Sequence, residues 1–221
     1  HGYAITDLYR TDPRMGSNED VQALSREAKA KGVGIVMDVV LNHIGSKHWW
    51  MRDLPAKDWI NNGAKFAPTN HRRTTIQDPH AAPADRAAFV EGWFVDAMPD
   101  LNQRNPHLAR YLIQNTLWWI GVSGLDGIRQ DTLPYAHRRF WRDWTAAIKR
   151  EYPHVRVVGE MFDGDPVLVS FFQGGQARHD ERRLGQQRLR ITAPFARDGP
   201  IGVRQRLGQP DQRGDDVGAG G

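Results

Sequence analysis

The stretch Val33-Gly-Ile-Val-Met-Asp-Val-Val40 decides the fold. It is an almost unbroken apolar run, the pattern of a strand buried on both faces. A helix signature precedes it, because Ser17 and two following acids predict a helix N-terminus and Gly32 a helix stop. Residues 17–40 therefore predict a helix followed by a buried strand.

Two further helix–strand pairs follow along the chain. Residues 106–120 predict a helix that begins with Pro106, and 124–130 a strand; residues 136–151 and 155–159 predict the next pair. A helix before each of three strands favours a parallel sheet with helical crossovers. The last two strands are about thirty residues apart, as in a (β/α)₈ barrel. The predicted fold class is α/β, a partial (β/α)₈ TIM barrel.

The segment between the first two strands is too long for one βα unit. Its excess, residues 45–102, is rich in Trp, Asn, Pro and His with weak periodicity, and predicts a small subdomain inserted in the loop after the strand ending near Val40. Residues 1–44 and 103–180 are then the barrel parts.

Residues 181–221 differ in composition from the rest of the chain. They contain eight Arg, eight Gly and five Gln, and have few apolar residues and no buried-strand run. We expect a tail that is disordered or not native to the barrel, such as one translated in a wrong frame, although a genuine flexible tail remains an alternative. A barrel needs about 250 residues, so we expect the chain by itself to be incomplete, inactive and prone to aggregate.

Composition excludes several classes of function. The 221 residues are 39% hydrophobic and 25% charged, as in globular proteins. The net charge is +4, of which the tail carries +3 with a single aromatic residue, so we expect no nucleic-acid partner. The sequence has no apolar run of about eighteen residues, so no membrane partner is expected. The absence of cysteine fits a bacterial cytoplasm or periplasm equally, and oligomeric state stays open.

Polar residues end each predicted strand, where the active site of a parallel barrel lies. Asp38 is followed by Asn42 and His43, and the later strands end in Arg129-Gln-Asp131 and Gly159-Glu160. Arg129 and Asp131 are two positions apart and share a face, so we expect the guanidinium to keep the carboxylate ionised, as a nucleophile requires.

Glu160 ends the strand after Asp131 and lies among Val158, Met161 and Phe162. Such an apolar setting favours the protonated form, as a general acid requires. Neighbouring strands lie about 4.8 Å apart, so the two carboxyl groups can approach the roughly 5–5.5 Å separation of retaining glycosidases. Asp131 would be the nucleophile and Glu160 the acid/base.

Three stretches carry a specific resemblance. Asp38-Val-Val-Leu-Asn-His43, Gly124-Leu-Asp-Gly-Ile-Arg-Gln-Asp-Thr132 and Val157-Val-Gly-Glu160 resemble, in order and spacing, three of the four sequence regions of the α-amylase family, glycoside hydrolase family 13. Residues 1–7, 45–50 and 98–102 are similar to its neopullulanase and cyclomaltodextrinase branch, especially members from bacterial polysaccharide utilisation. The likeness covers residues 1–180.

The resemblance implies a retaining α-glycoside hydrolase that acts on α-1,4-linked glucans, maltooligosaccharides or cyclomaltodextrins. It assigns Asp131 as nucleophile, Glu160 as acid/base and Arg129 as electrostatic partner. Asp38 and His43 would contact sugar, and Tyr3 would stack under the reacting glucose. An α-glucosyl transferase or isomerase of the same family is an alternative, and a non-catalytic amylase-like module is another, although the catalytic residues are present. No cofactor is required.

The sequence departs from the family at two places. The fourth region, whose Asp clamps the sugar, is not found, because the similar His179-Asp180 comes only nineteen residues after Glu160. Leu133-Pro134-Tyr135 stands where many α-amylases carry Lys-His, with a His that contributes to a calcium site. This argues against structural calcium and leaves Asn42, a ligand in those relatives, as its candidate residue.

Structural interpretations compete at several positions. Asp38 and Arg129 could be a strand-end ion pair, and Asp126 is expected to be structural. His43, His48 and Asp53 have spacing compatible with a metal but lack a convincing third ligand. Tryptophans 49, 50 and 59 could stack on sugar or belong to the core. Asp100 and Asn102 could brace the insert or contact sugar.

Overall fold

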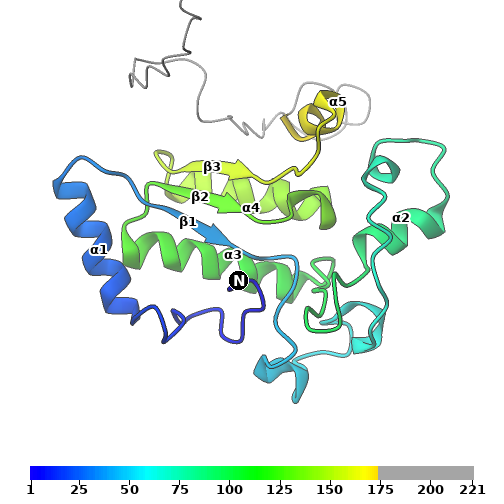
Figure 1. Ribbon diagram of the computed structural model, residues 1–221, viewed down its shortest axis with the longest axis horizontal. Coiled ribbons are helices and arrows are strands. Elements are labelled where there is room, and N and C mark those ends of the chain that lie inside the picture. The colour runs from blue at the N-terminus through cyan, green and yellow to red at the C-terminus, as the bar shows by residue number, and fades with distance from the viewer. Residues whose placement is uncertain (174–221) are drawn as a thin grey trace, which may run out of the picture.

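The computed structural model describes residues 1–173; the predicted tail and residues 174–180 lie outside the described part. Its centre is a parallel sheet in the order β1-β2-β3 (Figure 1). The strands are β1 (Val36–Val39), β2 (Gly127–Gln130) and β3 (Arg156–Gly159). Asp38 pairs with Arg129, which pairs with Val158. The three strands and their parallel direction confirm the predicted fold class as part of a TIM barrel.

Helices α3 and α4 cover one face of the sheet (Figure 1). The α-helices are α1 (Asn18–Ala30), α2 (Pro83–Val90), α3 (Pro106–Ser123), α4 (Arg138–Glu151) and α5 (Pro166–Ser170). Short 3₁₀ turns are η1 (Trp49–Met51), η2 (Asn61–Ala64), η3 (Arg73–Ile76), η4 (Leu133–Tyr135) and η5 (Phe171–Gln173). The helices predicted before each strand are therefore confirmed.

Local chemistry sets the helix ends. Ser17 caps α1 in a reciprocal capping box with Asp20, and Asn105 caps α3 by accepting from two backbone N–H groups. Gly124 ends α3 in the left-handed conformation, φ 59°, which glycine adopts without steric cost. Gly124 thus ends α3 just before β2 begins at Gly127.

The core lies between the sheet and helices α3 and α4. Ile128 and Val157 are buried against a helix layer that includes Leu112, Ile120 and Trp144. The indole N–H of Trp144 donates to Thr116 Oγ1 at 2.9 Å, which joins α4 to α3 without leaving a buried donor unpaired. This layer fixes the register of the strands that carry the polar residues.

The prediction that the first strand is buried on both faces is wrong for the described residues. The strand begins at Val36, whose side chain is 57% exposed, and Val33 is exposed as well. Side chains alternate across a strand, and the helices cover only the face of Met37 and Val39. The opposite face carries Val36 and Asp38, and no described element covers Val36.

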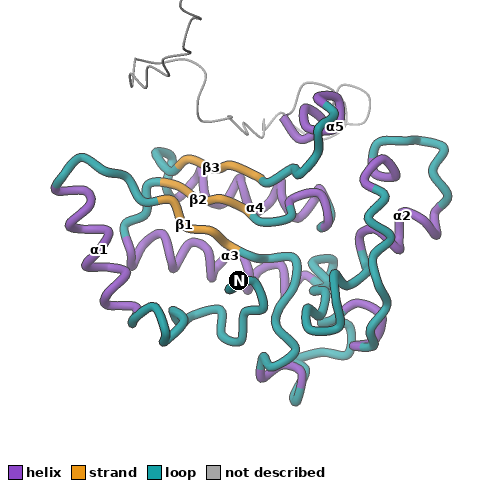
Figure 2. The backbone as a smooth tube through the Cα atoms, in the orientation of Figure 1, coloured by secondary structure: helices purple, strands orange, loops and turns teal. Residues whose placement is uncertain are grey.

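Residues 45–102 lie beyond the carboxyl ends of the strands and consist mostly of loops (Figures 1 and 2). They return toward β1 by an antiparallel bridge between His43 and Asp100, and Leu101 N–H donates to Asn42 O at 2.8 Å. This segment therefore borders the edge of the sheet where the strands end. In the described part of the chain, no helix is long and apolar enough to cross a membrane.

Gly45 allows the N-terminal segment to pack against the chain that follows β1. Its N–H donates to Ile5 O at 2.7 Å, and a Cβ at this position would lie 2.5 Å from Ala4 O. We expect Gly45→Ala to lower the free energy of unfolding by about 1–3 kcal/mol, because backbone must move. Chemical denaturation measures this change.

Gly164→Ala is the matched control. A Cβ at Gly164 meets no atom within 4 Å, so its effect should stay within about 0.5 kcal/mol. Equal effects of the two substitutions would contradict a close approach at Gly45.

Candidate active site

The open face of the sheet presents a row of polar side chains. Met37, Ile128 and Val157 are neighbours across the strands and point toward the helices, so Asp38, Arg129 and Val158 point to the opposite face. Asp131 and Glu160 lie just past the ends of β2 and β3. Each is two positions after Arg129 or Val158, so each is expected on the same face. The predicted sharing of one face by Arg129 and Asp131 is confirmed.

The Arg129 guanidinium binds three carboxylates at once. Nη1 lies 2.7 Å from Asp38 Oδ2 and 2.8 Å from Asp131 Oδ1, and Nη2 lies 2.7 Å from Glu160 Oε1. Each strand supplies one or two members of this cluster, and the parallel register brings them to a single edge. Bonds between charged groups of this length are stronger than neutral hydrogen bonds.

Backbone bonds extend the sheet ladder into the cluster. Asp131 N–H donates to Val39 O at 3.0 Å, and Glu160 N–H donates to Gln130 O at 2.8 Å. Thr132 has φ 50°, an uncommon conformation for a β-branched residue, and its N–H donates to Glu160 Oε2 at 2.9 Å. The sequence assigned no role to Thr132, because its contact with Glu160 depends on the neighbouring strand.

Burial controls the acidity of Asp131. Its side chain is 8% exposed, and burial raises its pKa to about 6, while the Arg129 guanidinium lowers it and the Glu160 charge raises it. Arg129 thus favours the ionised carboxylate, as expected, but desolvation outweighs the ion pair and leaves the pKa above its ordinary value. Asp131 is nevertheless mostly ionised at neutral pH.

The Glu160 carboxylate has polar partners as well as the apolar neighbours that the sequence predicted. One carboxylate oxygen contacts Arg129 and the other accepts from Thr132 N–H. Phe162, expected to shield it, is 81% exposed. The strand end places the carboxylate against Arg129, and Phe162 lines the same cavity.

Tyr3 and His43 lie on the Asp38 side of the cluster. The Tyr3 hydroxyl donates to Asp38 Oδ2 at 3.3 Å, and the Arg129 guanidinium lies 6.0 Å from the ring centroid. His43 is buried, which lowers its pKa to about 4, and its Nε2 has no partner in the described part of the chain. The neutral ring therefore retains one ring nitrogen for a polar ligand.

A cavity of about 390 Å³ joins these residues. Tyr3, His43, Arg129, Asp131 and Glu160 all line it, together with Arg73 and Phe94 of the segment 45–102. The volume lies within the usual range for small-molecule sites. Every predicted catalytic residue thus faces one space, and Asp38 borders it through Tyr3 and Arg129.

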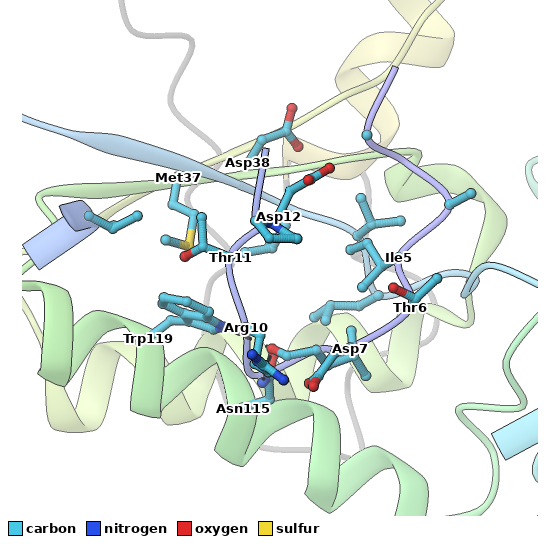
Figure 3. Close-up of a pocket in the computed structure, with 18 of the residues that line it drawn as sticks. Ile5, Thr6, Asp7, Arg10, Thr11, Asp12, Met37, Asp38, Asn115 and Trp119 are labelled. Atoms are coloured by element: carbon cyan, nitrogen blue, oxygen red, sulfur yellow. Dashed lines mark hydrogen bonds between the residues drawn. The ribbon is translucent and has the colours of Figure 1, made fainter. Parts of the chain in front are cut away.

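A larger hollow of about 710 Å³ lies between the N-terminal segment, β1 and α3 (Figure 3). Asp7, Arg10 and Asp12 line it, and Asn115 and Trp119 of α3 each donate to Leu8 O beside it. It contains neither Asp131 nor Glu160. The smaller cavity is therefore the candidate active site.

Asn42 belongs to an amide–carboxylate network, although its own Oδ1 has no hydrogen-bond partner among the described residues. Asn42 Nδ2 donates to Asp100 Oδ1 at 3.0 Å and Asn61 Nδ2 donates to Asp100 Oδ2 at 2.7 Å, so amide groups occupy both carboxylate oxygens. Calcium needs about six to eight oxygen ligands. The described residues include no group of three or more acidic, His or Cys side chains placed for a metal.

The other polar and aromatic candidates are mainly structural. Asp126 accepts from Ile35 N–H at 2.9 Å, as the structural interpretation predicted, and Asp100 and Asn102 brace the segment 45–102. Trp50 and Trp59 belong to the core, whereas Trp49 is 52% exposed. These positions lie outside the cavity lining.

Fold and site together define a class of protein: part of a parallel α/β barrel with carboxyl groups gathered around one arginine at the carboxyl ends of its strands. Residues 1–183 match the family model of the α-amylase catalytic domain. The chain belongs to the α-amylase family.

Known relatives agree with this assignment. The chain is 30% identical to a cyclomaltodextrinase of Geobacillus thermopakistaniensis over 73% of its own length and 26% of that protein. It is 27% identical to α-amylase 3 of Dictyoglomus thermophilum, over 79% of the chain and 36% of that protein. An α-amylase structure from Geobacillus thermoleovorans, complexed with acarbose, matches with a TM-score of 0.66 and 30% identity, over 77% of the chain and 35% of that chain. The chain thus spans about a quarter to a third of these relatives.

The Asp131 carboxyl should titrate near pH 6. Because its pKa is raised above the ordinary 3.8, the folded state holds this proton more tightly than the unfolded state. Wild-type protein should therefore lose stability relative to Asp131→Asn as pH rises from about 4 to about 6. Carboxyl ¹³C NMR and denaturation at each pH measure both effects.

Arg129→Ala should raise the pKa of Asp131, because the guanidinium lowers this pKa in the wild-type protein. Arg139→Ala, on the exposed surface of α4, is the control. An Asp131 titration midpoint near pH 4 in the wild-type protein would contradict the conclusion that burial raises the pKa of Asp131.

The Asp100 network should stabilise the protein without calcium. We expect EDTA to leave the melting temperature unchanged. Asp100→Asn should cost about 1–3 kcal/mol, because an amide there confronts the Asn42 and Asn61 donors in a buried site. Asp96→Asn, an exposed position in the same segment, is the control. A melting temperature lowered by EDTA and restored by calcium would contradict the amide network.

Proposed function

We propose that the complete protein is a retaining α-glycoside hydrolase. One observation carries the proposal: Arg129 contacts both Asp131 and Glu160, at 2.8 and 2.7 Å, from the face that borders the 390 Å³ cavity. Two carboxyl groups bound to one guanidinium at neighbouring strand ends support the proposal that both act on the same bond. This arrangement supports a nucleophile and an acid/base that work as a pair.

In the first step, an Asp131 oxygen attacks the anomeric carbon while Glu160 delivers its proton to the departing glycosidic oxygen. A covalent glycosyl-enzyme forms and the leaving sugar departs as an alcohol. Asp131, with a pKa of about 6, is ionised at neutral pH and can attack. Glu160 must carry a proton at this stage, so the arriving glycosidic oxygen replaces one of its present donors.

In the second step, Glu160 takes a proton from water, which attacks the anomeric carbon and releases Asp131. The geometry of the free protein suits this step, because Glu160 accepts from both Arg129 and Thr132 N–H, as a carboxylate does. Two inversions at carbon give net retention of the α configuration.

The proposed substrates are α-1,4-linked glucans, maltooligosaccharides or cyclomaltodextrins. Relatives named cyclomaltodextrinase, maltogenic amylase and neopullulanase support this class. We assign Asp38 and the free His43 Nε2 to sugar hydroxyls and Tyr3 to the ring face of the reacting glucose. Tyr3 and His43 border the cavity beside Asp131, as these roles require.

A transferase or isomerase is the second candidate. It would use the same carboxylates but exclude water from the glycosyl-enzyme. The relatives named cyclomaltodextrinase and neopullulanase support hydrolysis as the first candidate. A non-catalytic module would not need the Asp131–Arg129–Glu160 arrangement.

We further propose that residues 1–44 and 103–180 act within a complete barrel and that residues 45–102 form an inserted subdomain over the strand ends. The sugar-clamping Asp of the fourth region would then come from another part of the complete protein.

Asp131→Asn in the complete protein should abolish maltooligosaccharide turnover, by at least about 10⁴-fold, while binding is kept. The amide preserves shape but cannot form the glycosyl ester. ¹H NMR of the reaction measures turnover and the first anomer released, and calorimetry measures binding.

Asp143→Asn, on the exposed face of α4, is the matched control and should keep wild-type turnover. Wild-type protein should release the α-anomer first. Substantial turnover by Asp131→Asn, or a β-anomer released first, would refute the retaining mechanism.

A further inference from the structure

Arg73 connects the segment 45–102 with the chain after β3. It opens η3, and its Nε donates to Asp163 Oδ2 at 2.8 Å. Both side chains are mostly shielded, at 29% and 15% exposed. An ion pair of this kind is less screened than a surface pair. Arg73 is therefore held in place although it lies on a loop.

The same guanidinium lies against the loop that follows Asp131. The Asp163 carboxylate raises the pKa of Arg73, and the nearby Tyr135 hydroxyl adds to this effect. Tyr135, in η4, is fixed in turn by His71, whose Nδ1 lies 3.1 Å from the hydroxyl oxygen. Arg73 thus meets both loops that leave the proposed catalytic carboxylates.

Arg73 lines the 390 Å³ cavity together with Glu160, Tyr135 and Phe162. Tyr135 is close enough to Glu160 for that charge to raise its pKa, after the larger effect of its burial. Tyr3 and His43 belong to the Asp38 side of the cluster. The cavity therefore has one side beside Asp38, where the reacting glucose is proposed to bind, and another side beside Arg73, next to Glu160, the proposed proton donor.

A general acid delivers its proton to the leaving oxygen, so the groups around Glu160 are the neighbours of the leaving sugar. Arg73 has five N–H donors and uses Nε on Asp163. Its remaining donors suit sugar hydroxyl oxygens, which accept charge-assisted hydrogen bonds. The exposed ring of Phe162 offers an apolar surface on the same side.

We propose that Arg73 is a substrate-binding residue that holds the leaving sugar beside Glu160, an inference that rests on the proposed function. Asp163 fixes the plane of the guanidinium, and the segment 45–102 thereby contributes to substrate selection.

The test compares two substrates in the complete protein. Maltotriose has a leaving sugar, whereas α-glucosyl fluoride has none but still requires Asp131 and the base role of Glu160. Arg73→Ala should lower kcat/KM for maltotriose about 10- to 100-fold and leave turnover of the fluoride within about threefold. Arg73→Lys, which keeps charge and a donor, should recover part of the loss.

Arg72→Ala is the matched control. Arg72 is the adjacent residue, forms an exposed ion pair with Asp85 at 3.0 Å and does not line the cavity. It should leave both substrates unaffected. Melting temperatures of all variants exclude unfolding, and a variant that fails to fold is replaced by Arg73→Gln.

An equal fall for maltotriose and the fluoride would overturn the inference, because Arg73 would then act through the position of Glu160. An unchanged kcat/KM for maltotriose would overturn it as well. Failure of the proposed function is a separate result, because Asp131→Asn would then keep turnover of both substrates.

Discussion

The site depends on one cation shared among three carboxylates. Without Arg129, the carboxyl groups of Asp38, Asp131 and Glu160 would face one another in a partly buried cluster with no cation between them, and both like charges and desolvation oppose such an arrangement. The guanidinium has the geometry for this task, since its planar fork presents several donors at once, which a lysine ammonium cannot do as a rigid group. The pKa of Asp131, about 6, shows that the charge of Arg129 does not fully offset burial and the neighbouring carboxylates. Burial of this carboxyl group is what keeps it close to protonation.

The register of the sheet is what allows one guanidinium to reach all three groups. A shift of one residue in β1 or β3 would send its polar residue to the helix-covered face. Such a shift is opposed by the apolar neighbours on that face, Met37, Ile128 and Val157, which pack toward α3 and α4. The free energy of core packing therefore maintains the charge cluster on the other side of the same strands.

The order of helices and strands was predictable because each boundary has local chemistry, as at Ser17, Asn105 and Gly124. Sharing of a face by Arg129 and Asp131 was also predictable, from strand parity alone. Other features depend on residues that are far apart in sequence. Thr132 meets Glu160 only because β2 and β3 are neighbours, and Arg73 is ninety positions from Asp163. The sequence neighbours of Glu160 suggested an apolar setting, but a side chain at a strand end also contacts the adjacent strand.

Two kinds of contact attach the segment 45–102 to the strand ends, and they differ in strength and in sensitivity to solvent. The contact near β1 is fully buried: Asp100 accepts from Asn42 and Asn61, and the backbone of Leu101 pairs with Asn42. Breaking this contact would leave buried polar groups without hydrogen-bond partners, at a cost in free energy. The contact near β3 includes the mostly shielded pair of Arg73 with Asp163, which salt screens less than a surface pair but more than a fully buried contact. Apolar packing adds to this ion pair, because Phe89 and Val90 of α2 form a buried cluster with Tyr135 of η4. Different interactions thus hold the segment on the two sides of the cavity: a buried hydrogen-bond network near Asp38, and an ion pair with aromatic packing near Glu160.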